Sequence, residues 1–257
     1  MFDVRPERHI ALGTDVQTGA RVVIKTAGVR PSVALGAAFA REAALLRRCQ
    51  HIGLPRFHAL LDTDAGPALI TEYVPGDSLR AVRDRGRHDE ALILDVAHQL
   101  SDVLEMFRHE GVVHGAIHPD HILVAPTAAG HRIVLVDLAH AHSPSTPGGG
   151  RPGNRGIEDY LAPEQLAGAA GDHRSDLYAL GAVLYEMVVG RPTASSHRLL
   201  ELIGDLLSHD PAGRPASALE FRLALARQPR KAGATGSGDV DALAARMPSG
   251  GSRRVAA

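Results

Sequence analysis

The residues best suited to chemistry lie between Val112 and Ala139, a stretch that reads VVHGAIHPDHILV, then a short connection, then IVLVDLA. It contains four histidines, of which His114, His118 and His121 lie in the first part, and an aspartate, Asp137, near its end. Imidazole and carboxylate groups together suit a transition metal such as zinc, whereas magnesium prefers oxygen ligands. What these side chains do depends on which of them the surrounding helices and strands bring together.

Composition limits the kind of protein that carries these residues. With 257 residues, 44% of them hydrophobic, the chain can bury a sizeable core. The net charge of -1 gives no general attraction to nucleic acid or to anionic membranes. A single cysteine, Cys49, excludes a disulfide framework, and no apolar run approaches the roughly 20 residues of a membrane span. Without a signal-peptide pattern, we expect a cytoplasmic protein that binds neither nucleic acid nor membrane.

The first part of the chain adds two charged residues. β-branched residues before Lys25 predict a strand over residues 20–25, and apolar residues at helical spacing predict a helix over residues 39–49 that carries Glu42. Each of these charged residues could instead be an ordinary surface group, because residues at strand ends and on helix surfaces are commonly solvated. Sequence alone leaves open whether these two side chains meet.

Periodic apolar positions predict the remaining elements. A polar turn joins two apolar stretches, so we expect a hairpin of strands over residues 57–61 and 68–74. The second half predicts helices over residues 89–110, 174–189, 197–208 and 216–227. Residues 140–159 are polar and rich in glycine. From residue 228 onward the composition changes to Gly, Ser, Ala and Arg, which predicts a disordered tail over residues 228–257.

In this order, the motifs resemble those of a protein kinase, of the eukaryotic-like Ser/Thr type found in bacteria. The matching residues are VVIK at 22–25, the helix carboxylate Glu42, EYVPG at 72–76, His114 and Pro119 in the loop, Asp137 in VDLA, APE at 162–164, Asp176, and RP at 214–215. The resemblance covers about residues 9–227. It implies an α+β, bilobal fold with a small N-lobe over residues 1–74, made of an antiparallel sheet and the αC helix. A mainly helical C-lobe would follow over residues 75–227.

The resemblance also assigns roles to individual residues. The nucleotide-binding residues that it implies are Lys25, Glu42, Thr71, Glu72, Val74 and Asp137, with Asp137 holding a metal. A second set would hold the fold together. In it, His114, Leu138 and Leu46 form an apolar column between the lobes, Asp176 holds the loop backbone, and Glu164 pairs with Arg214.

Several kinase positions carry other residues. Ala116 occupies the position of the catalytic Asp, so we expect no catalytic residue there; His118 replaces the catalytic-loop Lys and His121 the metal-binding Asn. Gly115 replaces the Arg that would receive an activation-loop phosphate. No glycine occurs over residues 3–8, where the Gly-rich loop would fall, so the first strand is expected to be missing or to start late. The αG region, between Pro192 and Pro211, is short.

These replacements predict a pseudokinase, an inactive binding or scaffold module for a protein partner that the sequence does not identify. Losing a general base lowers the rate by a factor of about 10²–10⁴. Losing a charge-stabilising donor lowers it by a further factor of about 10²–10³. The alternative is a weak or atypical ATP-binding Ser/Thr kinase with residual phosphoryl or nucleotidyl transfer. Only that alternative requires a cofactor, ATP with magnesium. Asp120 acting as a displaced base is a further alternative.

The kinase resemblance would bring His118 and His121 to Asp137, where the three side chains would suit a transition metal. The alternative is simpler. In it, His118 faces an open, solvated cleft and His121 hydrogen-bonds only the loop backbone.

Overall fold

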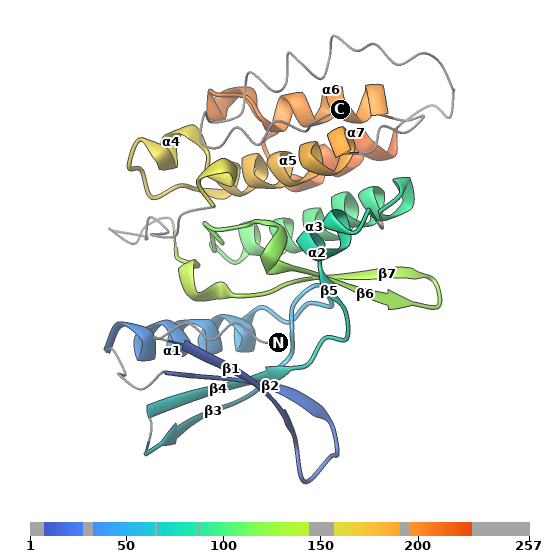
Figure 1. The fold of residues 1–257 in the computed structure, drawn as a ribbon. Helices are drawn as coiled ribbons and strands as arrows, with labels where there is room; N and C mark the ends of the chain where they lie inside the picture. The colour runs from blue at the N-terminus through green and yellow to red at the C-terminus, as the bar shows by residue number, and fades with distance from the viewer. Residues whose placement is uncertain are drawn as a thin grey trace.

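The structure is a computed structural model that describes residues 8–27, 33–64, 66–86, 88–143, 157–190 and 196–227. Figure 1 shows a four-stranded sheet with helix α1 beside it, a second small sheet in the middle of the molecule, and a stack of helices beyond that sheet. This is the α+β, two-lobed architecture that the motifs predict. Among the described residues, no helix is both long enough and apolar enough to cross a membrane.

The N-lobe sheet consists of β1 (Arg8–Thr14), β2 (Arg21–Ala27), β3 (Phe57–Thr63) and β4 (Gly66–Glu72). Its strand order is β1-β2-β4-β3, and all neighbours are antiparallel. Strand β1 was not predicted from sequence. The expected absence of the first strand and of the Gly-rich loop concerns residues 1–8, of which 1–7 lie outside the described residues.

Helix α1 (Val33–Arg48) packs on this sheet and carries Glu42 on its buried side. Phe39 and Ala43 of the helix form a small core with Leu69 of β4. Arg47 and Arg48 fill its last turn, where positive charge stabilises the helix dipole. The helix begins well before residue 39, the predicted start, because the sequence VALGAA offers little contrast between apolar and polar positions.

A second sheet, with strand order β5-β6-β7, lies between the N-lobe and the helices. It consists of β5 (Asp77–Ser78), β6 (Ile122–Thr127) and β7 (Gly130–Leu135). Helix α2 (Leu79–Asp84) follows β5, and short 3-10 turns flank β6 and β7, namely η1 (Pro119–His121) and η2 (Leu138–His140). His118 and Asp137 directly precede these two turns, and His121 ends the first of them.

The C-lobe is built around two long helices, α3 (Glu90–His109) and α5 (His173–Gly190). Asp89 caps α3, since its side chain accepts a hydrogen bond from the Leu92 amide at 2.9 Å. The remaining elements are η3 (Glu158–Tyr160), α4 (Pro163–Leu166), α6 (Ser196–Leu206), η4 (Pro211–Gly213) and α7 (Ala218–Ala226). Between Pro192 and Pro211, where kinases carry the αG region, the helix that the described residues contain is α6. Most of the 140–159 segment and the whole 228–257 tail lie outside them.

Candidate active site

Lys25 of β2 and Glu42 of α1 form an ion pair, with 2.6 Å between Nζ and Oε1. The Lys25 side chain is 9% exposed and that of Glu42 is 1% exposed, so neither charge is the solvated surface group that each could have been. The antiparallel register places Lys25 opposite Leu69, beside the helix that packs on β4. The structure therefore brings together the two N-lobe charges that the kinase resemblance pairs.

Asp137 lies at the start of η2, directly after β7, with a backbone φ of +66°. This left-handed conformation costs a residue with a side chain about 1 kcal/mol or more, and it clusters at functional sites. The Asp137 side chain is nearly buried. The backbone therefore holds this carboxylate in one uncommon orientation.

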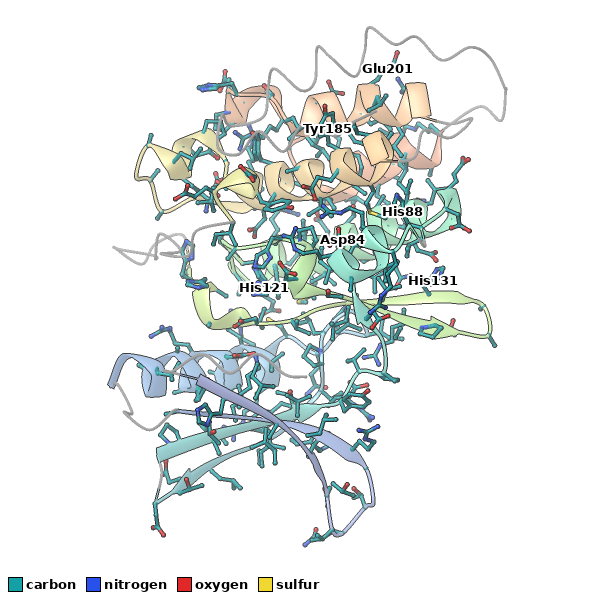
Figure 2. The ribbon with its side chains drawn as sticks, in the orientation of Figure 1. Asp84, His88, His121, His131, Tyr185 and Glu201 are labelled. Carbon is teal, nitrogen blue, oxygen red and sulfur yellow. The ribbon has the colours of Figure 1, made fainter. Side chains whose placement is uncertain are left out.

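His121 sits on the η1 turn and contacts both neighbouring loops. Its Nδ1 lies 3.1 Å from the carbonyl oxygen of Ala116, and its Nε2 lies 3.3 Å from Oδ2 of Asp137. Figure 2 labels His121 between the N-lobe sheet and helix α5. The expected hydrogen bond to the loop backbone is present, and the ring also contacts the aspartate.

His118 is 7% exposed, so the expectation that it faces an open, solvated cleft is wrong. Burial lowers the pKa of His118 and keeps its imidazole neutral at pH 7. Its Nδ1 lies 3.4 Å from Oδ2 of Asp120, and its ring packs 3.8 Å from the ring of His121, between centroids.

Asp120 has a second partner, Arg80 of α2, at 2.7 Å. Hydrogen bonds from His118 and from Arg80 lower the pKa of Asp120. The Arg80 partner was not foreseen from sequence, because nothing in the chain pattern links residues 40 positions apart. A carboxylate held ionised by a guanidinium is a weak proton acceptor, so the geometry does not favour Asp120 as a displaced base.

The loop around Ala116 is fixed from below by Asp176 of α5. Its carboxylate accepts hydrogen bonds from the amides of His114 at 2.7 Å and Gly115 at 2.9 Å. Burial raises the pKa of Asp176 to about 7, despite these two hydrogen bonds. Gly115 has a φ of +74°, and a Cβ there would lie 3.2 Å from His142. A residue with a side chain would therefore be strained at this position in the present loop conformation.

The three residues expected to form a column between the lobes are all buried. Leu46 of α1 and Leu138 of η2 belong to one buried cluster that continues into the C-lobe. His114 is fully buried; burial lowers its pKa to about 3, so the ring is neutral. Further down, Arg214 donates two hydrogen bonds to Glu164, at 2.7 and 2.8 Å. These contacts hold the frame in which the loop residues sit.

The segment joining the lobes begins with Thr71 and Glu72 at the end of β4 and continues through Val74, with Thr71 and Val74 buried. The Glu72 carboxylate turns away to Arg132 of β7, with hydrogen bonds of 2.7 and 3.2 Å. Burial alone would raise the pKa of Glu72, but Arg132 and the Arg56 amide outweigh it and lower the pKa. Sequence reasoning missed Arg132, because a pair spanning two lobes leaves no local signal.

The three side chains proposed as a transition-metal site are not arranged as metal ligands. Among the described residues, no group of three or more His, Cys, Asp or Glu side chains could hold a metal ion. The physical reason is that His118 turns to Asp120, while His121 packs against His118 and contacts Asp137 directly. The structure therefore does not bring His118, His121 and Asp137 together as a set of metal ligands.

Comparison with known proteins agrees with this frame. The model of the family described as "Protein kinase domain" matches residues 9–206. The chain is 28% identical to Serine/threonine-protein kinase pkn2 of Myxococcus xanthus over 252 residues, which covers 85% of this chain and 30% of that protein. It is 31% identical to Serine/threonine-protein kinase PknB of Mycobacterium leprae over 200 residues, 75% of this chain and 31% of that protein. It is 30% identical to Serine/threonine-protein kinase PkaA of Streptomyces coelicolor over 181 residues, 70% of this chain and 33% of that protein.

The chain therefore belongs to the protein kinase family and is similar to Ser/Thr kinases of bacteria. It spans about a third of the length of these three relatives. The family generally uses ATP and magnesium.

The prediction that the chain is not an enzyme is contradicted by these findings. The family model matches residues 9–206, which include Lys25, Glu42 and Asp137, and the relatives are named as Ser/Thr protein kinases. The prediction gave too much weight to the residue at position 116. Phosphoryl transfer asks little covalent chemistry of the protein, because positioning and charge stabilisation supply most of the catalysis.

Proposed function

We propose that this chain binds ATP with magnesium between its lobes and transfers a phosphoryl group, slowly, to a serine or threonine hydroxyl. The observation that carries the proposal is the buried ion pair of Lys25 and Glu42, 2.6 Å long. Buried ion pairs are often no more stabilising than apolar residues of the same volume, so stability alone does not account for this one. Glu42 accepts one N–H of the ammonium, which leaves two for phosphate oxygens.

The residues present suit ATP with one magnesium ion. The carboxylate of Asp137 offers oxygen ligands, and magnesium held there would neutralise charge on the phosphates. At the position of the second metal-binding side chain, His121 offers nitrogen, which magnesium does not prefer. The backbone of Glu72 and Val74, beside the buried Thr71, would hold the adenine ring.

We assign His118 as the group that takes the proton of the substrate hydroxyl, since Ala116 cannot. The ring is neutral at pH 7, and Asp120 lies 3.4 Å from Nδ1. A carboxylate there favours the proton on Nδ1, which leaves the lone pair of Nε2 as the acceptor. Without the usual base and the usual lysine, a typical turnover of about 1–100 per second falls to about one per minute at best.

The test is incorporation of label into a Ser/Thr substrate protein with magnesium and ATP labelled on either the γ- or the α-phosphate. Phosphoryl transfer predicts label from γ-phosphate only, on serine or threonine. Label from α-phosphate would instead show nucleotidyl transfer, the other outcome of the weak-enzyme alternative. No label from either nucleotide over hours, with folded protein, would refute the proposal.

Variants separate this activity from a contaminating kinase. Lys25→Met and Asp137→Asn should abolish incorporation, and His118→Asn should lower the turnover about a hundredfold or more, the lower end of the effect of losing a general base. Arg21→Met is the matched control, because Arg21 lies exposed on the same strand as Lys25. Equal incorporation by wild type and Lys25→Met would show that the label does not come from this chain.

A further inference from the structure

A cavity of about 610 Å³ lies behind the segment that joins the lobes. Its apolar wall comes from the end of α1 and from the connection to β3, and consists of Leu46, Cys49, Leu54, Pro55 and Phe57. A volume of this size lies within the range of small-molecule sites, about 300–1,000 Å³. Of the residues assigned to the nucleotide, only Glu72 reaches this cavity, so the two sites are separate.

The polar lining of the cavity is mainly positive. Three arginines, Arg47, Arg56 and Arg132, face a single carboxylate, Glu72. The Arg132 guanidinium already has partners in the protein, because it donates hydrogen bonds to the Glu72 carboxylate at 2.7 Å and to the carbonyl oxygen of Ile52 at 2.9 Å. The excess positive charge therefore lies with the other two arginines.

Arg47 and Arg56 have donors to spare. Within the described part of the chain, the Arg47 guanidinium lies 4.4 Å from the centre of the Phe57 ring and forms no ion pair. Arg56 is 82% exposed, and its Nε is 3.8 Å from Glu72, which is a long contact. Stacking on an aromatic face leaves the N–H edge of a guanidinium available to an anion.

We propose that this cavity binds a small molecule with an apolar body and a carboxylate head. The apolar wall would take up the body, and Arg47 and Arg56 would bind the carboxylate through charge-assisted hydrogen bonds. A neutral ligand of the same shape would gain only the apolar contacts. A cationic one would meet the excess of arginine.

The cavity also contacts the parts that position ATP. Leu46 lies one helical turn after Glu42 on α1, and the backbone of Glu72 continues into the adenine-binding segment. A ligand that favours one position of α1 must change the affinity for ATP, and ATP must change the affinity for the ligand by the same factor. This coupling rests on the proposed function, whereas binding of the carboxylate does not.

The direct test uses 4-phenylbutyrate and its neutral amide as probes, titrated calorimetrically into the full chain without nucleotide. We expect the carboxylate to bind at least tenfold more tightly than the amide. Arg47→Gln and Arg56→Gln should each reduce that preference severalfold, whereas Arg41→Gln, an exposed arginine on the same helix, should not. Comparing the two probes within each variant removes any effect on folding, since a damaged wall weakens both.

Cys49 gives a readout that needs no nucleotide. It is the only cysteine of the 257 residues, it lines the cavity, and burial raises the pKa of its thiol. Saturating 4-phenylbutyrate should slow its modification by a small thiol reagent severalfold, and the amide at the same concentration should not. Equal affinity for both probes, no binding at millimolar concentration, or an unchanged preference in the Arg47→Gln/Arg56→Gln double variant would overturn the proposal. Carboxylate binding without any effect on ATP affinity would remove the coupling alone.

Discussion

The ring of His121 is placed between two oxygen atoms, with Asp137 Oδ2 at 3.3 Å from Nε2 and the Ala116 carbonyl at 3.1 Å from Nδ1. Oδ2 of Asp137 belongs to the carboxylate that would hold magnesium under the proposed function. There the His121 ring would compete with the metal for this oxygen.

This competition predicts the effect of His121→Asn. The amide removes the ring nitrogen that contacts Asp137 and supplies an oxygen ligand, so the magnesium concentration needed for half-maximal stabilisation by ATP should fall about tenfold. The measurement is thermal unfolding at fixed ATP across a magnesium series. His131→Asn is the matched control. His131 lies on β7, where Figure 2 labels it, and its Nδ1 is 2.9 Å from Oδ2 of Asp95. An unchanged magnesium requirement in His121→Asn would refute the competition.

The Lys25–Glu42 pair makes a prediction about stability. Glu42→Leu leaves the ammonium of Lys25 buried without its carboxylate, which should cost about 3–5 kcal/mol of unfolding free energy. The double variant Lys25→Met/Glu42→Leu removes both charges and should recover most of that loss. Denaturant unfolding of the wild type and both variants measures it. If the double variant is as unstable as the single one, the loss comes from packing and not from charge.

Restoring a carboxylate at position 116 should raise the rate. Ala116→Asp supplies a carboxylate base at the usual position, in addition to His118, so turnover should increase at least tenfold, toward the range of about 10²–10⁴ typical of a general base. Because Ala116 is 2% exposed, the new side chain will also lower stability. Ala116→Asn has the same shape without the base, so the ratio of the two turnovers isolates the proton transfer. A ratio near one would show that a base at 116 is not what limits the rate.

The Glu164–Arg214 pair should shape acid unfolding. Burial would raise the pKa of Glu164, but hydrogen bonds from Arg214 and Ser175 outweigh it and hold the pKa below its ordinary 4.5. A lowered folded-state pKa means that the pair stabilises the protein above about pH 4.5. That contribution is lost as the pH falls through the folded-state value. The Arg214 side chain is fully buried, so its charge depends on this partner.

Replacing Glu164 therefore has a defined outcome. Glu164→Gln should cost about 3–5 kcal/mol near pH 7 and flatten the dependence of stability on pH between about 5 and 3. Glu201→Gln, which removes the exposed pair with Arg198, should cost less than about 1 kcal/mol. The measurement is denaturant unfolding across that pH range. A Glu164→Gln profile parallel to that of the wild type would contradict this account.

The sequence predicted those elements that carry a strong period or a cap. Helix α3 begins where Asp89 predicts it, and α5 lies within one residue of its predicted ends. Strand β1 and the sheet of β5, β6 and β7 were not predicted, because short strands that are partly buried on both faces show no clean alternation. Gly111, in the left-handed conformation with a φ of +62°, follows the end of α3.

Within the site, motif order predicted which residues lie near each other, but not their states. Lys25 with Glu42, and Arg214 with Glu164, lie together as the kinase resemblance implies. The burial of His118 and the Arg80 partner of Asp120 depend on packing between distant segments, which one sequence does not encode locally. The prediction that the chain is not an enzyme was wrong for another reason. It took the missing aspartate side chain at position 116 as evidence that the activity was missing.

Arg132 and Glu72 join the C-lobe strand β7 to the end of the N-lobe strand β4 through two hydrogen bonds, and the same arginine also reaches the carbonyl oxygen of Ile52. Any hinge movement that separates the lobes must stretch these bonds. Under the proposed function, spent nucleotide would leave through that opening, and the residence time of ADP would depend on this one guanidinium. For turnover as slow as proposed, a long residence time would carry little penalty.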